Sequence, residues 1–408
     1  MRLPVENIVR LGFLALLLLL AAGSASHMLL MENSYLVTAY NRYFIILAFL
    51  AWGAAAVILC VTPGCRIYTA PFTIAAYILY LLWIIIPTLL VTTSAQESLA
   101  SKMSYTWTPL LTLVVAYTVA RNYGHSKSWQ LGFLFLGFVC AVQFVRVMFD
   151  FSAITEESHL VCAYFVMYAL PLMLLVKSKL LRILLSLAVL MVIFASFKRG
   201  GLVALVLGLV AYLVTLQFIA NKISMGSILI GVSVLAMFAV ILVILGTTGE
   251  STVFDRFQTS NNDTGSGRTL VWPVTLGMIE NSDAIGLLFG HGSGAVQADS
   301  PIMLSAHNDF LEITYDYGLV GVVLYTFAFV SLGFYILRMI HQKSAYAPSM
   351  VLLYAVYGVL SLISHVAIYY WMSVVMMTVG YCIGCHKHDA SLSAELLETS
   401  ETNHAGNK

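Results

Sequence analysis

The sequence GLVALVLGLVAYLVTLQFI occupies residues 201–219 and contains no charged side chain. An α-helix needs about 20 predominantly apolar residues to cross the hydrocarbon core of a bilayer. This stretch is therefore typical of a transmembrane helix. The rest of the chain has the same character, because 60% of its 408 residues are hydrophobic and 10% are charged. Soluble globular proteins carry about 25% charged residues, so the composition indicates a membrane protein.

Apolar stretches of similar length recur along the chain and predict about twelve transmembrane helices in an all-α polytopic fold. The first stretch follows Arg2 and Arg10, so it suits either a cleaved signal peptide or an uncleaved first helix. The apolar residues Leu29–Met31 favour the uncleaved helix. The expected spans are Leu11–Met31, Tyr43–Val61, Phe72–Val91, Trp107–Ala120, Trp129–Phe149, Leu160–Val176, Leu180–Ala195, Gly201–Ile219, Ser227–Leu245, Tyr317–Leu337, Met350–Ser364 and Tyr369–Ile383.

The distribution of Lys and Arg residues predicts the orientation, since short cytoplasmic loops are enriched in them. With the N-terminus inside, most of the 20 Lys and Arg residues fall in inner loops. Residues 1–388 then form one transmembrane domain, and the loop between the ninth and tenth spans faces the periplasm. An even number of spans returns the Ser/Glu/Asn-rich tail, residues 389–408, to the cytoplasm, where we expect it to be disordered.

Residues 246–316 form the long hydrophilic loop between those two spans, and local patterns predict that it is partly helical. Apolar spacing predicts a helix from Arg268 to Ile279, in which Pro273 is tolerable only in the first turn. The stretch Gly290–Gly294 is a glycine-rich turn. The stretch Ser305–Ile313 predicts a helix that leads into the tenth span.

Two further classes of function receive little support. The run Cys382–His386 matches the haem-attachment pattern C-x-x-C-H, but it lies at the inner end of the last span, so packing cysteines are the better interpretation. No segment combines basic and aromatic residues over any length, which argues against nucleic-acid binding.

Four motifs in the second half of the chain together resemble the superfamily of O-antigen ligases and O-antigen polymerases, which are membrane glycosyltransferases. They are Ser196–Gly201 (SFKRGG), Gly267–Arg268 with Trp272 following, Gly290–Gly294 (GHGSG), and His307–Glu312 (HNDFLE) with Gly318–Gly321. The resemblance covers Phe197 to Gly321. It implies a GT-C-like fold with the active site in the periplasmic loop of a bacterial inner-membrane protein.

The resemblance also implies the reaction and the residues that perform it. The enzyme would need no metal and no cofactor, and would move a glycan from undecaprenyl diphosphate to an acceptor glycan or to lipid A-core. The essential arginines of the family fall on Arg199 and Arg268, and its essential histidine falls on His307. The chain departs from the family's Ser-x-Arg pattern, because Lys198 precedes the first arginine. Second-tier substrate-binding candidates are Lys198, Arg256, His291 and Asn308.

These residue types suit the chemistry. Arginine binds diphosphate oxygens bidentately and stabilises the charge of the leaving group, and histidine is the usual base near neutral pH. The chain has no Asp-x-Asp pair, which weakens a metal-dependent transferase. Singly, Arg199 could anchor in lipid head groups, Arg268 could be a surface charge, and His307 could belong to a helix cap. Other polar residues are less decided: Asp309 and Glu312 either orient His307 or face water, and His159 and His365 have a structural interpretation.

Four functions remain open from the sequence. A polymerase would join lipid-linked repeat units, in a membrane lipid environment and with a chain-length regulator as a further partner. A ligase would transfer finished glycan to lipid A-core. A flippase or transporter would show repeated halves and broken helices, which the sequence lacks. A non-enzymatic scaffold would leave the arginines and the His-Asn pair unexplained.

Overall fold

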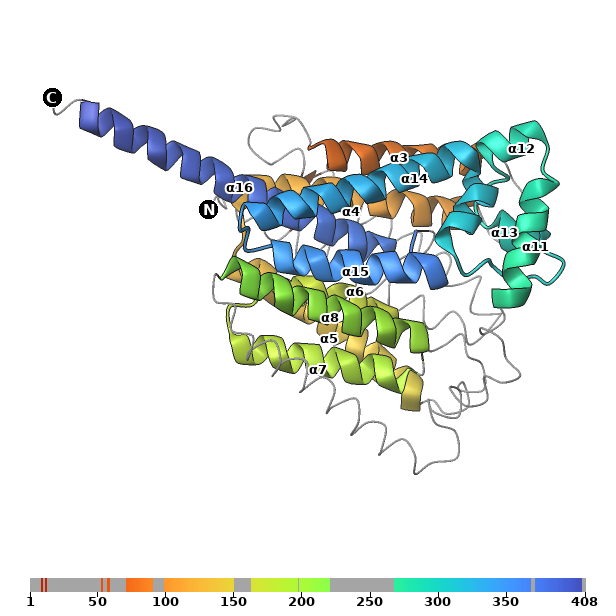
Figure 1. The fold of residues 1–408 in the computed structure, drawn as a ribbon, viewed down its shortest axis with the longest axis horizontal. Coiled ribbons are helices and arrows are strands. Elements are labelled where there is room, and N and C mark those ends of the chain that lie inside the picture. Colours follow the sequence, from red (N-terminus) through yellow and green to blue (C-terminus); the bar gives the residue numbers. More distant parts are fainter. Residues whose placement is uncertain are drawn as a thin grey trace.

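The computed structural model describes residues 71–90, 99–149, 163–196, 198–220, 268–367 and 371–405, together with positions 9, 12, 53, 57 and 58. Within these residues every regular element is a helix, and no strand occurs among them. The long helices lie side by side in a bundle (Figure 1). Three short helices gather at one end of this bundle, and the C-terminal helix projects from the other end (Figure 1). The expected all-α class is therefore confirmed.

Helices coincide with each expected span that falls in a continuously described range. By length and composition, α3 (Phe72–Leu90), residues Gly200–Ile219 of α8 (Arg199–Ile219), and α14 (Asp309–His341) could each cross a membrane. The expected spans Leu11–Met31, Tyr43–Val61 and Ser227–Leu245 lie outside the described residues, apart from a few single positions. The helices of the bundle are α3 (Phe72–Leu90), α4 (Leu99–Tyr123), α5 (Lys127–Phe149), α6 (Ala163–Met173), α7 (Lys179–Ala195), α8 (Arg199–Ile219), α14 (Asp309–His341), α15 (Ala347–Ile363) and α16 (Met372–Ala405).

Large apolar side chains cover much of the outside of the bundle. Examples are Leu82 on α3, Phe138 on α5, Leu207 on α8, and Val323 and Phe334 on α14, all of which are exposed. Soluble monomers rarely expose contiguous apolar surface of this kind, whereas a bilayer solvates it. This surface supports the assignment as a membrane protein.

Small residues let pairs of helices pack closely. On α16, a Cβ atom at Gly380 would lie 2.5 Å from the Leu113 carbonyl oxygen of α4, and one at Gly384 would lie 2.7 Å from the Tyr117 carbonyl oxygen. Two small residues four apart allow helix backbones to approach in this way. Cys382 and Cys385, on the same stretch, are buried and unpaired with each other. Both cysteines therefore serve packing, as the sequence interpretation predicts.

Helix α14 contains a kink at Gly318, whose φ and ψ are 74° and −179°. Three successive carbonyl groups beside the kink accept hydrogen bonds from outside the helix. The Tyr315 oxygen accepts from the His291 N–H at 3.0 Å, and the Asp316 oxygen accepts from the Gly292 N–H at 2.9 Å. The Tyr317 oxygen accepts from Trp83 Nε1 at 3.0 Å. The kink is thus compensated by the glycine-rich turn and by α3.

Three short helices, α11 (Arg268–Glu280), α12 (Ala284–Phe289) and α13 (Ala295–Asp299), precede α14. The predicted helix from Arg268 to Ile279 is confirmed, and residues 268–308 are partly helical as expected. The expectation for Pro273 is wrong, because five helical residues precede it in α11 and it lies inside the helix. The predicted helix start at Ser305 is also wrong. Helix α14 begins at Asp309, since the Asn308 side chain caps it by accepting from the Leu311 N–H at 3.2 Å.

The structure corrects the expectation of a disordered C-terminal tail. Helix α16 continues through the polar residues to Ala405 and extends beyond the bundle (Figure 1). Residues of high helix propensity explain the extension, because Ala394, Glu395, Leu396 and Leu397 follow one another in its course. A polar composition alone does not prevent a helix from continuing out of a packed one.

Candidate active site

The last turn of α15 joins the helix ends that carry the candidate residues. Arg268 at the start of α11 donates from Nε to the Ile363 carbonyl oxygen at 3.0 Å. Asn308 before α14 donates from Nδ2 to the Leu362 carbonyl oxygen, also at 3.0 Å. The last carbonyl groups of a helix lack intrahelical partners and attract cationic donors. These two bonds therefore hold α11 and the start of α14 against the same end of α15.

Glycines at the start of α8 allow this helix to pack closely against the end of α15 and against α6. A Cβ atom at Gly200 would lie 2.6 Å from Ile363 Cδ1, and one at Gly201 would lie 2.8 Å from Tyr164 Cε1. The glycines that follow Arg199 thus admit neighbouring side chains. Arg199 is the first residue of α8, and the structure describes its backbone but not its side chain. Lys198 is the N-cap residue, and its N–H donates to Ser196 Oγ at 3.4 Å.

His307 has a backbone conformation that is uncommon for a residue with a side chain. Its φ is 52°, and Met303 and Lys343 are the other described non-glycine residues with positive φ. Such a conformation costs about 1 kcal/mol or more and persists only where neighbouring contacts enforce it. Here the following residue, Asn308, is fixed by its bonds to Leu311 and Leu362. Strain of this kind is concentrated at functional sites, so it supports His307 as a candidate.

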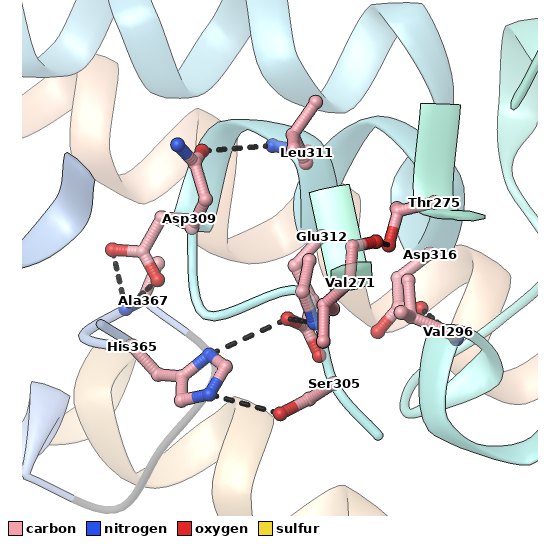
Figure 2. A network of polar contacts seen from close by, with 12 residues as sticks. Val271, Thr275, Val296, Ser305, Asp309, Leu311, Glu312, Asp316, His365 and Ala367 are labelled. Atoms are coloured by element: carbon pink, nitrogen blue, oxygen red, sulfur yellow. Dashed lines mark hydrogen bonds and ion pairs between the residues drawn. The ribbon is translucent and has the colours of Figure 1, made fainter. Parts of the chain in front are cut away.

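The imidazole of His307 packs against a second imidazole. The ring centroids of His307 and His365 lie 4.4 Å apart, and the ring planes are inclined by 39°. His365 lies between α15 and α16, and its Nε2 is 2.9 Å from Ser305 Oγ. Its Nδ1 is 3.3 Å from Glu312 Oε2. Figure 2 shows the His365 ring between the Ser305 hydroxyl and the Glu312 carboxylate.

Two carboxylates in the first turn of α14 hold the segments that bear the two imidazoles. Glu312 accepts the Ala306 N–H at 2.8 Å, beside His307. Asp309 accepts the N–H groups of Val366, at 2.9 Å, and Ala367, at 3.2 Å, beside His365 (Figure 2). Both carboxylates are buried, so neither faces water as one sequence interpretation allowed.

Burial and positive neighbours keep both histidines neutral. Burial is the main cause that lowers the pKa of His307 to about 3, and nearby His365, Arg268 and Lys198 lower it further. Burial likewise lowers the pKa of His365 to about 4, with a smaller contribution from Arg268. A neutral imidazole can accept a proton at pH 7, which a general base must do. Because the charges of Lys198 and Arg268 lower the pKa of His307, these three residues lie near one another.

The remaining candidates differ in their surroundings. The His291 ring stacks on the Tyr315 ring with centroids 4.2 Å apart, and its Nδ1 lies 3.1 Å from the Tyr315 carbonyl oxygen. Through these contacts, His291 attaches the glycine-rich turn to α14 near its kink. Asn308 caps α14, which is a structural role. Arg256 lies outside the described residues.

Three residues of the cluster were not among the sequence candidates. His365 was interpreted as structural, and for Asp309 and Glu312 the sequence left open whether they orient His307 or face water. The acidic pair in the sequence HNDFLE was the available signal, since two carboxylates so close to an apolar span require buried partners. His365 carried no local motif that would reveal its contact with His307. In the described ranges, no group of three or more His, Cys, Asp or Glu side chains is arranged to hold a metal ion.

A comparison with protein families identifies the segment that contains most of this cluster. Residues 183–326 match the family model described as O-antigen ligase. The resemblance to the O-antigen ligase and polymerase superfamily is confirmed. No curated protein matches the chain. The O-antigen ligase segment includes Lys198, Arg268, His307 and Glu312, but it ends before His365. The match supports a membrane glycosyltransferase of the ligase or polymerase type.

Proposed function

We propose that the chain transfers a glycan from a polyprenyl diphosphate carrier to a sugar hydroxyl, as a polymerase of lipid-linked repeat units. The observation that carries this proposal is that Arg268 and Lys198 lie near enough to His307 to lower the pKa of its imidazole, at one end of the bundle. Arg268 and Lys198 would bind the diphosphate, and His307 would receive the acceptor's proton. Arg199, at the start of α8 beside Lys198, would contribute a further guanidinium.

In the proposed step, the acceptor hydroxyl oxygen attacks the anomeric carbon of the donor glycan. The bond between that carbon and the phosphate oxygen breaks, and its electron pair leaves with the polyprenyl diphosphate. His307 takes the hydroxyl proton, which is worth typically 10²–10⁴-fold in rate. The Arg268 Nε donates to the Ile363 carbonyl oxygen, and the planar guanidinium with its five N–H donors suits bidentate binding of phosphate oxygens. Guanidinium groups can thus stabilise the leaving group without a metal ion.

The distribution of charge over the bundle supports a periplasmic location for this site. Cationic residues occur where helices begin or end at the opposite end of the bundle, and Arg121 of α4 there donates to the Lys387 carbonyl oxygen of α16 at 2.7 Å. Cytoplasmic loops are enriched in such residues. The cationic residues of that end are Arg121, Lys127, Lys177, Lys179, Arg182, Arg338, Lys343 and Lys387.

This orientation leads to a proposal for the organisation of the whole chain. Residues 1–388 would form one transmembrane domain of about twelve helices in the bacterial inner membrane, and residues 246–316 would form its periplasmic loop. Both termini would then be cytoplasmic, with the end of α16 extending into the cytoplasm. Labelling of single introduced cysteines from either side of the membrane would test this arrangement. Labelling of position 280 from the cytoplasm alone would contradict it.

The proposed activity is tested by alanine variants of Arg199, Arg268 and His307. The assay supplies purified protein in nanodiscs with an oligosaccharide on undecaprenyl diphosphate and measures glycan transfer. We expect each variant to lose activity at an unchanged protein level. Arg338→Ala and His341→Ala, which alter exposed residues at the far end of α14, serve as controls. Full activity of all three site variants would remove the proposed site.

A ligase is the second candidate, because the matched family model is described as O-antigen ligase, and the match itself does not separate a ligase from a polymerase. The two activities share the donor and the proposed chemistry, so the acceptor separates them. A strain that lacks the chain would accumulate a single-repeat product if the chain is a polymerase. The same strain would accumulate free polymer without attachment to lipid A-core if the chain is a ligase. Loss of all periplasmic glycan, with lipid-linked units retained in the cytoplasmic leaflet, would instead indicate a flippase.

A further inference from the structure

A buried carboxylate, imidazole and hydroxyl lie in series beside the proposed base. Glu312 Oε2 is 3.3 Å from His365 Nδ1, and His365 Nε2 is 2.9 Å from Ser305 Oγ. All three side chains are buried, and Figure 2 shows the His365 ring between the other two. Burying polar groups is costly unless they are paired, and both ring nitrogens of His365 have polar neighbours here. The hydrogen bond with Ser305 therefore fixes the orientation of the His365 ring, and Glu312 is a close polar neighbour of Nδ1 without hydrogen-bond geometry.

The backbone that carries His365 is also held firmly. The His365 carbonyl oxygen accepts from Trp371 Nε1 at 2.9 Å. The next two N–H groups, of Val366 and Ala367, donate to Asp309. Asp309 itself accepts from the Tyr325 hydroxyl at 3.1 Å. The connection between α15 and α16 thus presents His365 on a rigid support.

The same support extends to the segment that carries His307. Glu312 contacts the His365 ring with the carboxylate oxygen that accepts the Ala306 N–H. A single oxygen atom therefore links His365 to the backbone beside His307. The two imidazoles meet directly, with ring centroids 4.4 Å apart. A movement of either histidine would disturb the other.

We propose that His365, held by Glu312 and Ser305, is a positioning residue that fixes the imidazole of His307 for proton transfer. This inference rests on the proposed function of His307 as the base. His365 covers one face of the His307 ring and excludes water from it. The charged or titratable groups near His307 are His365 from the α15–α16 connection, Arg268 from α11, Lys198 before α8, and Asp309 and Glu312 in the first turn of α14.

The consequence is a specific change in pH dependence when His365 is removed. In the intact site, burial lowers the pKa of His307 to about 3. Opening one face of the ring to water would raise this pKa toward the ordinary value of about 6.5. The acid limb of the pH profile of kcat/KM reports the pKa of the free enzyme's essential base. We therefore expect His365→Gln to move that limb upward by about 1 pH unit or more.

The experiment measures glycan transfer from pH 3 to pH 9 for the wild type, His365→Gln, Glu312→Gln and Ser305→Ala in nanodiscs, so that the range includes the acid limb that the His307 pKa of about 3 sets. We expect His365→Gln to lower kcat by about 10-fold or more and to leave the KM for the lipid-linked donor unchanged. The same variant should show the upward shift in the acid limb of its kcat/KM profile. Glu312→Gln should act in the same direction, and Ser305→Ala should act more weakly. Exposed His341→Gln and Glu280→Gln are the matched controls and should behave as the wild type.

Each outcome decides between the proposals. A uniform loss of rate with an unmoved acid limb would mean that His365 is merely structural, and a wild-type profile would remove its role altogether. If His365→Gln fails to give a monodisperse protein, Ser305→Ala decides, because it removes one hydroxyl and leaves the ring. Wild-type transfer by His307→Ala would overturn the proposed function itself. An inactive His307→Ala with a normal His365→Gln would overturn only the positioning role.

Discussion

The imidazole rings of His307 and His365 lie in contact, with centroids 4.4 Å apart, although 58 positions separate them in the chain. Neither ring can gain a proton without placing a positive charge near Arg268. The contact therefore favours two neutral rings. It also couples the protonation of the site to the stability of the fold.

The stability of the protein should fall as the pH is lowered from about 6.5 to about 4. The folded protein holds the pKa of His365 at about 4 and that of His307 at about 3, mainly through burial. An unfolded chain binds protons on both histidines at about pH 6.5, so it binds more protons than the folded state in this window. The stabilisation is thus fully present above pH 6.5 and is lost on acidification. We expect a loss on the order of 2 kcal/mol from His365.

Thermal unfolding of the detergent-solubilised protein over a pH series measures this effect. His365→Gln should flatten the dependence on pH between 6.5 and 4, even though it lowers stability at pH 7. His341→Gln alters an exposed histidine and should leave the dependence unchanged. Equal slopes for the wild type and His365→Gln would show that His365 does not titrate in this range.

Asp309→Asn should destabilise the connection between α15 and α16. The carboxylate accepts the N–H groups of Val366 and Ala367 and the hydroxyl of Tyr325, and an amide oxygen cannot replace both of its acceptor atoms. A buried donor left without a partner costs about 1–3 kcal/mol. We expect a lower Tm in thermal unfolding, with little change for the exposed Asp299→Asn. An unaltered Tm for Asp309→Asn would mean that these bonds contribute no net stability.

Gly318→Ala should disrupt the packing of α14 on α12. A Cβ atom there would lie 2.2 Å from the Leu288 carbonyl oxygen, and the φ of 74° disfavours any side chain. Gly277→Ala is the matched control, since a Cβ atom at that helical position meets nothing within 4 Å. The control should stabilise α11 by about 0.5–1 kcal/mol, because alanine is the better helix former. Similar yields and Tm values for both variants would argue against the kink as described.

Apolar length predicted the helices well because each long helix faces lipid or other helices. The expected Leu180–Ala195 and the observed α7, Lys179–Ala195, differ by one residue. The predictions failed where a local feature determined the outcome. Helix α14 begins later than the sequence pattern indicated, because Asn308 caps it. Helix α16 continues through polar residues because no helix-breaking residue ends it. Neither a cap nor the absence of a breaker appears in a pattern of hydropathy.

The site was predictable in part. The motifs contained Lys198, Arg268 and His307, and in the structure the charges of Lys198 and Arg268 lower the pKa of His307. His365 was out of reach for sequence reasoning, because its contact with His307 arises when the α15–α16 connection folds onto the start of α14. The glycines of the GHGSG turn were noticed, but their partner, the carbonyl groups at the α14 kink, appears only in three dimensions.

Arg268→Lys should separate a requirement for charge from a requirement for guanidinium geometry. The Arg268 Nε donates to the Ile363 carbonyl oxygen, and other N–H groups of the same guanidinium would bind two phosphate oxygens of the donor. A lysine keeps the charge, but its compact ammonium cannot make both contacts. We therefore expect Arg268→Lys to transfer glycan about 10²-fold more slowly than the wild type in nanodiscs, with Arg268→Ala slower still. Arg338→Lys, an exposed change at the far end of α14, should keep the wild-type rate. An unimpaired Arg268→Lys would mean that a point charge suffices to hold the diphosphate.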